Sequence, residues 1–174
     1  MSTPSQLDAQ GKQAFTEKKF QNAVDYFKQA ADLYQAESNS LQAAEMMNNA
    51  SVALLQAGQA DEALEATLGT DEIFANAKDI KRQAMAVGNQ AAALEALSRY
   101  DEAIQKYEQS AELFAQINEG DLRAMVIKSA AAIKLKTGKI TDSAFKMMGS
   151  LEAKDNPTFF ERILKFFYAL YQIR

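Results

Sequence analysis

An internal repeat of 40 residues constrains the fold of this chain more than any other feature of its sequence. The segment that begins at Phe20 is matched by segments that begin at Ala60, Tyr100 and Ile140, with no insertion or deletion between them. A small residue occupies the fourth place of each segment, at Ala23, Ala63, Ala103 and Ser143. A fixed period of this length is typical of stacked supersecondary units, each of which cannot bury its apolar face alone.

Further positions follow the same period and predict helices. One apolar column is Leu7, Met47, Val87 and Ile127, and a small column four residues later is Gly11, Ser51, Ala91 and Ala131. A second small column is Ala30, Thr70, Ser110 and Ser150. Residues three, four and seven apart share one face of a helix, and small residues let two helices approach closely. Each repeat is therefore expected to be a helix hairpin, with breaks near 18–19, 58–59, 98–99 and 138–139.

The sequence predicts an all-α solenoid of four hairpins followed by a C-terminal capping helix. The expected helices are about 4–18, 20–36, 39–57, 60–76, 79–97, 100–117, 121–137, 140–153 and 157–172. The array fills 1–156, with repeats at about 4–38, 39–78, 79–118 and 119–156, and 157–174 forms a hydrophobic capping or interface helix.

The repeat resembles the tetratricopeptide repeat (TPR) motif. The likeness rests on Gly11, Ala14, Phe20, Ala23 and Phe27 in the first unit, and on the equivalent run Ala91–Tyr107 in the third. The usual TPR period is about 34 residues, and the longer period here resembles the TPRs of kinesin light chain-like scaffold proteins. Thr67 and Thr70 depart from the family pattern, which prefers an aromatic residue and Ala at those columns.

Composition narrows the classes of function. The chain has no Cys and no His, which removes thiolate metal sites and the usual general base. Its net charge of −4 argues against general nucleic-acid binding. The acidic pairs that begin at Asp61 and Asp101 are explained by the helix dipole. We therefore expect no enzyme, no cofactor and no metal. The polar start and the lack of a long apolar run predict a cytoplasmic protein.

The TPR resemblance implies that a protein or peptide partner binds in the concave groove lined by the first helix of each hairpin. The groove residues expected on this basis are Lys12, Asn48, Asn49, Val52, Gln56, Met85, Asn89, Lys128, Ser129 and Lys136. Asn49 and Asn89 share a column, and an amide can pair with a peptide backbone of any sequence. The alternative is that these amides are solvated or bridge neighbouring helices. Lys12 and Asn49 also match two places of the carboxylate clamp of chaperone-binding TPRs, but the clamp is incomplete.

The last helix carries a second apolar stripe, formed by Phe159, Ile163, Phe166 and Leu170. Exposed apolar surface of this size usually marks an interface. Self-association as a homodimer is the first interpretation, followed by a wider cap that buries both stripes and by attachment to a membrane surface. The sequence as a whole predicts a protein-interaction scaffold or adaptor. The alternative function is an assembly or trafficking factor that docks on a membrane through this helix.

Overall fold

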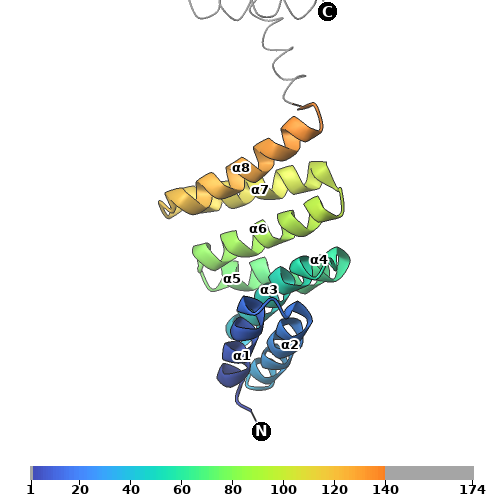
Figure 1. The fold of residues 1–174 in the computed structure, drawn as a ribbon. Coiled ribbons are helices and arrows are strands. Elements are labelled where there is room, and N and C mark those ends of the chain that lie inside the picture. Colours follow the sequence, from blue (N-terminus) through green and yellow to red (C-terminus); the bar gives the residue numbers. More distant parts are fainter. Residues whose placement is uncertain (1, 140–174) are drawn as a thin grey trace, which may run out of the picture. The chain divides into compact units, whose positions relative to one another are not determined.

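The fold was analysed in a computed structural model, which describes residues 2–139 of the chain. This part is all-α and contains no strand (Figure 1). Its helices are α1 (Pro4–Thr16), α2 (Phe20–Ala36), α3 (Ser40–Gln56), α4 (Ala60–Thr67), α5 (Thr70–Asn76), α6 (Ile80–Ala96), α7 (Tyr100–Gln116) and α8 (Gly120–Lys136). The helix hairpins predicted for the first three repeats are confirmed, and their ends lie within about two residues of the expected ones.

Apart from the interruption at Gly69, the turns that end helices recur every 20 residues, at half the period of the sequence repeat. Each contains one residue with φ between 59° and 79°, at Lys18, Ser38, Gly58, Lys78, Ser98, Asn118 and Gly138. In the first turn, the N–H of Lys18 donates to the Phe15 carbonyl and the N–H of Lys19 donates to the Ala14 carbonyl. This pair of hydrogen bonds is the Schellman motif, which satisfies the last carbonyls of a helix. The predicted breaks at 18–19, 58–59 and 98–99 are confirmed, and α8 ends before 138–139 as expected.

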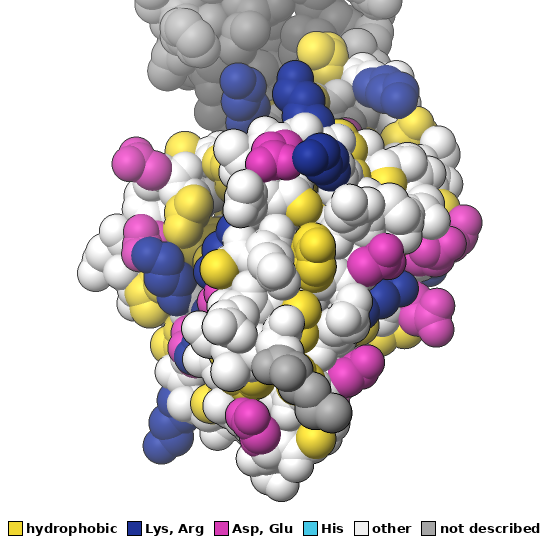
Figure 2. Space-filling model, turned by 60° about the horizontal axis from the view of Figure 1, so that its bottom comes forward, with side chains coloured by type: hydrophobic (Ala, Val, Ile, Leu, Met, Phe, Trp, Pro, Cys, Tyr) yellow, Lys and Arg dark blue, Asp and Glu magenta, His cyan; other side chains and the backbone are white. Residues whose placement is uncertain are grey.

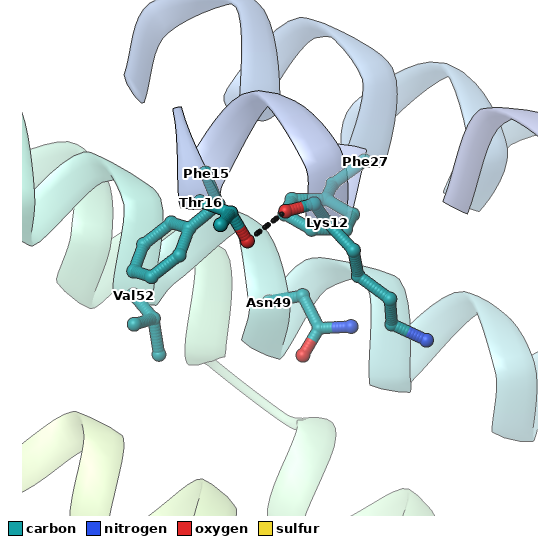
Figure 3. A pocket seen from close by; sticks show the side chains of 6 residues that line it. All are labelled: Lys12, Phe15, Thr16, Phe27, Asn49 and Val52. Carbon is teal, nitrogen blue, oxygen red and sulfur yellow. Dashed lines mark hydrogen bonds between the residues drawn. The ribbon is translucent and has the colours of Figure 1, made fainter. Parts of the chain in front are cut away.

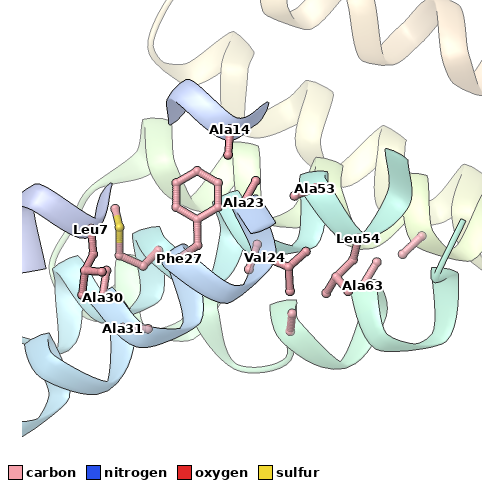
Figure 4. Close-up of a cluster of buried hydrophobic side chains, with 14 residues drawn as sticks. Leu7, Ala14, Ala23, Val24, Phe27, Ala30, Ala31, Ala53, Leu54 and Ala63 are labelled. Carbon is pink, nitrogen blue, oxygen red and sulfur yellow. The ribbon is translucent and has the colours of Figure 1, made fainter. Parts of the chain in front are cut away.

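The small columns lie where helices cross most closely. Ala23, Ala63 and Ala103 are fully buried. Gly11 has no room for a larger side chain, because a Cβ placed there would lie 2.6 Å from Cε1 of Phe27. Figure 4 shows the ring of Phe27 among small side chains of α1 and α2. The core of the first repeats is thus built from a few large side chains packed against Ala and Gly.

The two serines of the small columns within residues 2–139, Ser51 and Ser110, are buried and form hydrogen bonds between helices. The Ser51 hydroxyl on α3 donates to the Ala63 carbonyl on α4 at 2.8 Å, and the Ser110 hydroxyl on α7 donates to the Ala84 carbonyl on α6 at 2.8 Å. Both bonds join the two helices of one hairpin. A buried hydroxyl without a partner would be costly, so these bonds explain how Ser replaces Ala or Gly in a close crossing.

The prediction of one continuous helix over 60–76 is wrong. The chain leaves the helix at Leu68, which is extended, and Gly69 adopts φ 76° before α5 begins. The Thr70 hydroxyl donates to the Thr67 carbonyl at 2.8 Å. Gln90 of α6 donates through Nε2 to the same carbonyl at 3.1 Å and to Oδ1 of Asp71 at 2.9 Å. Side chains thus satisfy a backbone carbonyl at the interruption, as burial requires.

The chain divides into two compact units, residues 1–131 and 132–174. The structure describes the second unit only as far as residue 139. The predicted helices 140–153 and 157–172, and with them the capping helix, lie outside the described residues. Among the described helices, none is long and apolar enough to cross a membrane.

Candidate partner-binding face

The predicted groove residues lie on the first helix of each hairpin, namely α1, α3, α6 and α8, and their exposure differs. Exposed side chains are Lys12, Gln56, Met85, Lys128 and Lys136. Asn49, Val52, Asn89 and Ser129 are half-buried, and Asn48 is buried. The predicted set therefore includes exposed, half-buried and buried side chains, and their neighbours decide which of them a partner can reach.

Three of the predicted residues meet at one hollow of about 260 Å³ in the first two repeats. The α1 side chains at this hollow are Lys12, Phe15 and Thr16, and those of α3 are Asn49 and Val52. Phe27 of α2 closes its inner wall. Helix periodicity explains the grouping, since residues three and four apart on α1 and on α3 face the same side.

Apolar and polar side chains line different ends of this hollow. In Figure 3 the apolar side chains Phe15 and Val52 lie together at one end, and the polar ends of Lys12 and Asn49 lie at the other. Nζ of Lys12 is 2.7 Å from Oδ2 of Asp8, one helical turn before it. The Thr16 hydroxyl donates to the Lys12 carbonyl at 3.0 Å and is therefore occupied within its own helix.

Asn49 and Asn89 do not form the predicted ladder of free amides, because Asn89 is hydrogen-bonded to Asn48. Nδ2 of Asn89 donates to Oδ1 of Asn48 at 3.2 Å, and Nδ2 of Asn48 donates to the Ala44 carbonyl at 3.0 Å. Asn89 therefore bridges α6 to α3, which is the alternative that the sequence left open. Asn48 is only 8% exposed. Its amide joins helices, so its placement corrects the expectation that it lies open in a groove.

The remaining predicted residues do not gather at the hollow. Ser129 of α8 is half-buried, and the hydroxyl of Tyr107 on α7 donates to Oε2 of Glu95 at 2.9 Å. Burial raises the pKa of the Tyr107 phenol, and its bond to Glu95 adds to that effect. Met85 is 47% exposed, and Lys136 belongs to the second compact unit. The stripe of Phe159, Ile163, Phe166 and Leu170 lies outside the described residues.

Sequence reasoning did not assign Phe15 and Phe27 to a binding surface, because both belong to the TPR-like motif that packs the repeat. The signal that could have found them is Gly11. A glycine opposite a large aromatic ring, with Phe15 one turn further along α1, leaves apolar surface at the end of the crossing. Phe15 and Phe27 therefore both pack the first repeat and line the hollow.

A charged cluster at the start of α6 also escaped prediction. Arg82 forms ion pairs with Asp79 at 2.7 Å and with Glu45 of α3 at 2.9 Å, and its guanidinium lies 5.2 Å from the centre of the Phe74 ring. The N–H of Arg82 donates to the Asp79 carboxylate and lowers the pKa of that carboxyl. Since every charge in the cluster is paired, we interpret it as a structural contact between repeats.

The described residues offer no metal site, and the face shown in Figure 2 carries charges of both signs. Residues 2–139 contain no group of three or more acidic side chains placed to hold a metal ion. On the face shown in Figure 2, small groups of hydrophobic side chains lie between uncharged polar ones, and both signs of charge surround them. Such a mixed surface suits recognition of a protein segment better than recognition of a phosphate backbone.

Comparison with known proteins supports a helical-repeat protein. A family model described as "SNAP: Soluble NSF attachment protein, SNAP" matches residues 9–154. A search of curated proteins found no significant match. The matched segment includes nearly all of the predicted array, and it confirms a TPR-like helical-repeat family. The match does not support the narrower likeness to kinesin light chain.

Proposed function

We propose that this chain, which belongs to the soluble NSF attachment protein (SNAP) family, is an adaptor that binds a protein partner on the face of its first helices. The observation that carries the proposal is the family match over 9–154. The family is named for attachment to NSF, so NSF is the first partner to test.

The structure of the array supports an adaptor rather than an enzyme. Its fold repeats one hairpin, and therefore presents equivalent helix faces side by side, as binding arrays of this kind do. The chain has no His and no Cys. The perturbed tyrosine, Tyr107, is buried and bonded to Glu95, so its pKa follows from packing and not from a reaction centre.

The finer proposal places the partner against α1 and α3, with contributions from exposed residues of α6 and α8. Lys12, Asn49 and Val52 are the side chains that the structure brings together there. Gln56 of α3, Met85 of α6 and Lys128 of α8 are exposed residues predicted for the same groove. A cytoplasmic location, predicted from the sequence, agrees with this role and belongs to the same proposal.

The test is binding of the full chain to purified NSF from the same organism, measured by surface plasmon resonance. We expect saturable binding, and a loss of affinity of about threefold or more for the double variant Lys12→Glu with Val52→Glu. The matched control is Lys28→Glu with Gln21→Glu, two exposed positions on α2, which should bind as the unaltered chain does. Circular dichroism must show the same helical signal in all variants.

Two results would contradict the proposal at different levels. Absence of any saturable binding to NSF would refute NSF as a partner. Binding that is unchanged in the α1–α3 variant but lost in the α2 variant would keep the adaptor role and move the partner to the second helices.

A further inference from the structure

We infer that the hollow between α1 and α3 receives a large apolar side chain of the partner, next to an acidic residue that contacts Lys12. This inference rests on the proposed function, because it names the chemistry of the segment that the first-helix face would bind. Four observations lead to it: the apolar walls, the unpaired Asn49 amide, the single charge and the order of these groups along the hollow.

The apolar part of the hollow needs an apolar guest. Phe15 and Val52 form its walls, and both are only half-buried by the protein itself. Removing such surface from water is favourable by about 25 cal/mol for each Å² buried. A Leu, Met or Phe side chain would cover these walls, whereas a polar side chain would lose its water without gaining a partner.

Asn49 provides the polar contact to the backbone of the guest. Asn48 and Asn89 use their amides in hydrogen bonds to each other and to α3. Within residues 2–139, the amide of Asn49 has no hydrogen-bond partner, although the residue is half-buried at the hollow. An amide has both donors and an acceptor. Asn49 can therefore pair with the N–H and C=O of an extended segment of any sequence.

Lys12 provides the charge preference. It is the one charged residue among the six that line the hollow. Its side chain is 61% exposed, whereas that of Asp8, its ion-pair partner at 2.7 Å, is 20% exposed. An ammonium group has three donors, so Lys12 can bind a carboxylate of the partner without releasing Asp8.

The arrangement in Figure 3 fixes the order of the two guest groups. The apolar end at Phe15 and Val52 and the polar end at Lys12 and Asn49 are the two ends of one hollow. A segment bound across it would place its apolar side chain beside Val52 and its acidic side chain beside Lys12. We therefore expect a partner segment in which a large apolar residue is adjacent to Asp or Glu.

The test uses short blocked peptides and nuclear magnetic resonance of the full chain, which at 19.2 kDa is suited to this method. The probes are acetyl-Ser-Leu-Asp-Ser-amide and two matched peptides, one with Asn in place of Asp and one with Ala in place of Leu. Each is added up to about 10 mM, where a ligand with a Kd of ~1 mM is nearly saturating. The readouts are the Val52 methyl signals and the Asn49 side-chain amide signals.

We expect the Leu-Asp peptide to shift the Val52 and Asn49 signals with a Kd at least threefold lower than that of either matched peptide. Lys12→Gln should abolish the difference between the Asp and Asn peptides while leaving the Leu preference. The control Lys18→Gln, on the exposed turn after α1, should leave both preferences unchanged. Equal binding of the Asp and Asn peptides to the unaltered chain, or no shift of either signal, would overturn the inference.

A free carboxylate at the end of the peptide is a separate source of the same charge. A fourth probe, acetyl-Ser-Leu-carboxylate, distinguishes the two sources: if it binds more tightly than the Leu-Asp peptide, the hollow is a site for chain ends and the inference is wrong. Failure of these peptide experiments with intact binding of NSF overturns the inference alone. Peptide binding as expected without binding of NSF refutes NSF as the partner and leaves the inference standing.

Discussion

The second helix of the first repeat and that of the second repeat occupy equivalent places in the sequence but differ in structure. α2 is continuous over 17 residues, whereas the corresponding segment is divided into α4 and α5. The four residues at the interruption are Thr67 to Thr70, where α2 has Phe27 to Ala30. Both arrangements keep the period, because the turns at Gly58 and Lys78 have the same backbone form as the others. The repeat thus tolerates an interrupted helix as long as the turns before and after it keep their positions in the sequence.

The difference shows that a polar network can take the place of an aromatic packing residue. Phe27 fills its crossing with a ring. Thr67 is shorter, and Gln90 of α6 reaches its carbonyl instead. The equivalent of Gln90 in α3 is Ala50, and in α8 it is Ala130. Gln90 is thus a long polar residue where α3 and α8 have Ala, and it lies next to the one interruption among the helices of the described residues.

The largest expected effect tests whether the close crossings are independent of the interruption. Ala63→Leu and Ala103→Leu place a large side chain at fully buried positions of the broken and a continuous helix. Each should lower the free energy of unfolding by about 3 kcal/mol, because overpacking forces backbone shifts. Urea denaturation measures the change. Gln105→Leu, exposed on α7, is the control and should stay within about 0.5 kcal/mol. A clearly smaller loss of unfolding free energy for Ala63→Leu would show that the interrupted helix can move to accommodate the larger side chain.

The next effect concerns the side chain that supports the interruption. Gln90→Ala removes the hydrogen bonds to the Thr67 carbonyl and to Asp71. We expect the free energy of unfolding to fall by about 2 kcal/mol, since a buried acceptor loses one partner. The matched control is Gln10→Ala, in the same column but exposed on α1. Equal stability of the two variants would mean that Gln90 does not support the break.

A third experiment asks whether glycine alone causes the interruption. Gln109 of α7 is equivalent to Gly69, and Gln109→Gly should cost about 1 kcal/mol through helix propensity. Hydrogen exchange should still show protected amides through that part of α7, because Ser110 and Tyr107 keep their packing. Loss of protection at these amides would contradict this account and assign the break to glycine. Gly69→Ala should cost about 1 kcal/mol for a different reason, since φ 76° is unfavourable for Ala.

The smallest effect compares the turns of a continuous and a broken repeat. Ser38, in the turn after the continuous α2, and Lys78, in the turn after α5, have φ 59° and 60°, a region that disfavours residues with a Cβ. Ser38→Gly and Lys78→Gly should each raise the free energy of unfolding by about 0.5 kcal/mol, because relief of strain exceeds the added freedom of the unfolded chain. Thermal denaturation should show equal gains. Unequal gains would mean that the interruption alters the turn that follows it.

Much of the fold could be predicted because it depends on spacing. The columns through Ala23 and Gly11 set which helix faces meet, and the breaks near 18–19 and 58–59 followed from the period alone. The site was predicted only in part. Lys12, Asn49 and Val52 were assigned to one face and do meet at one hollow, but whether a partner binds there stays a prediction. Asn48 is buried and Asn89 bridges two helices, which is the alternative left open for Asn89, because the rotation of a helix by one residue decides whether an amide faces a neighbour or the solvent.

The sequence by itself determined the period, the helix hairpins, the small residues at crossings and the absence of His and Cys. These features are local or repeat identically, so neighbouring residues and helix geometry are enough to specify them. Only the tertiary structure decided that Gln90 supports a broken helix, that Asn89 pairs with Asn48, and that Asn49 is left unpaired beside Phe15 and Val52. Each of these depends on which side chain of one helix reaches a particular atom of another, and that distance is set by packing across repeats.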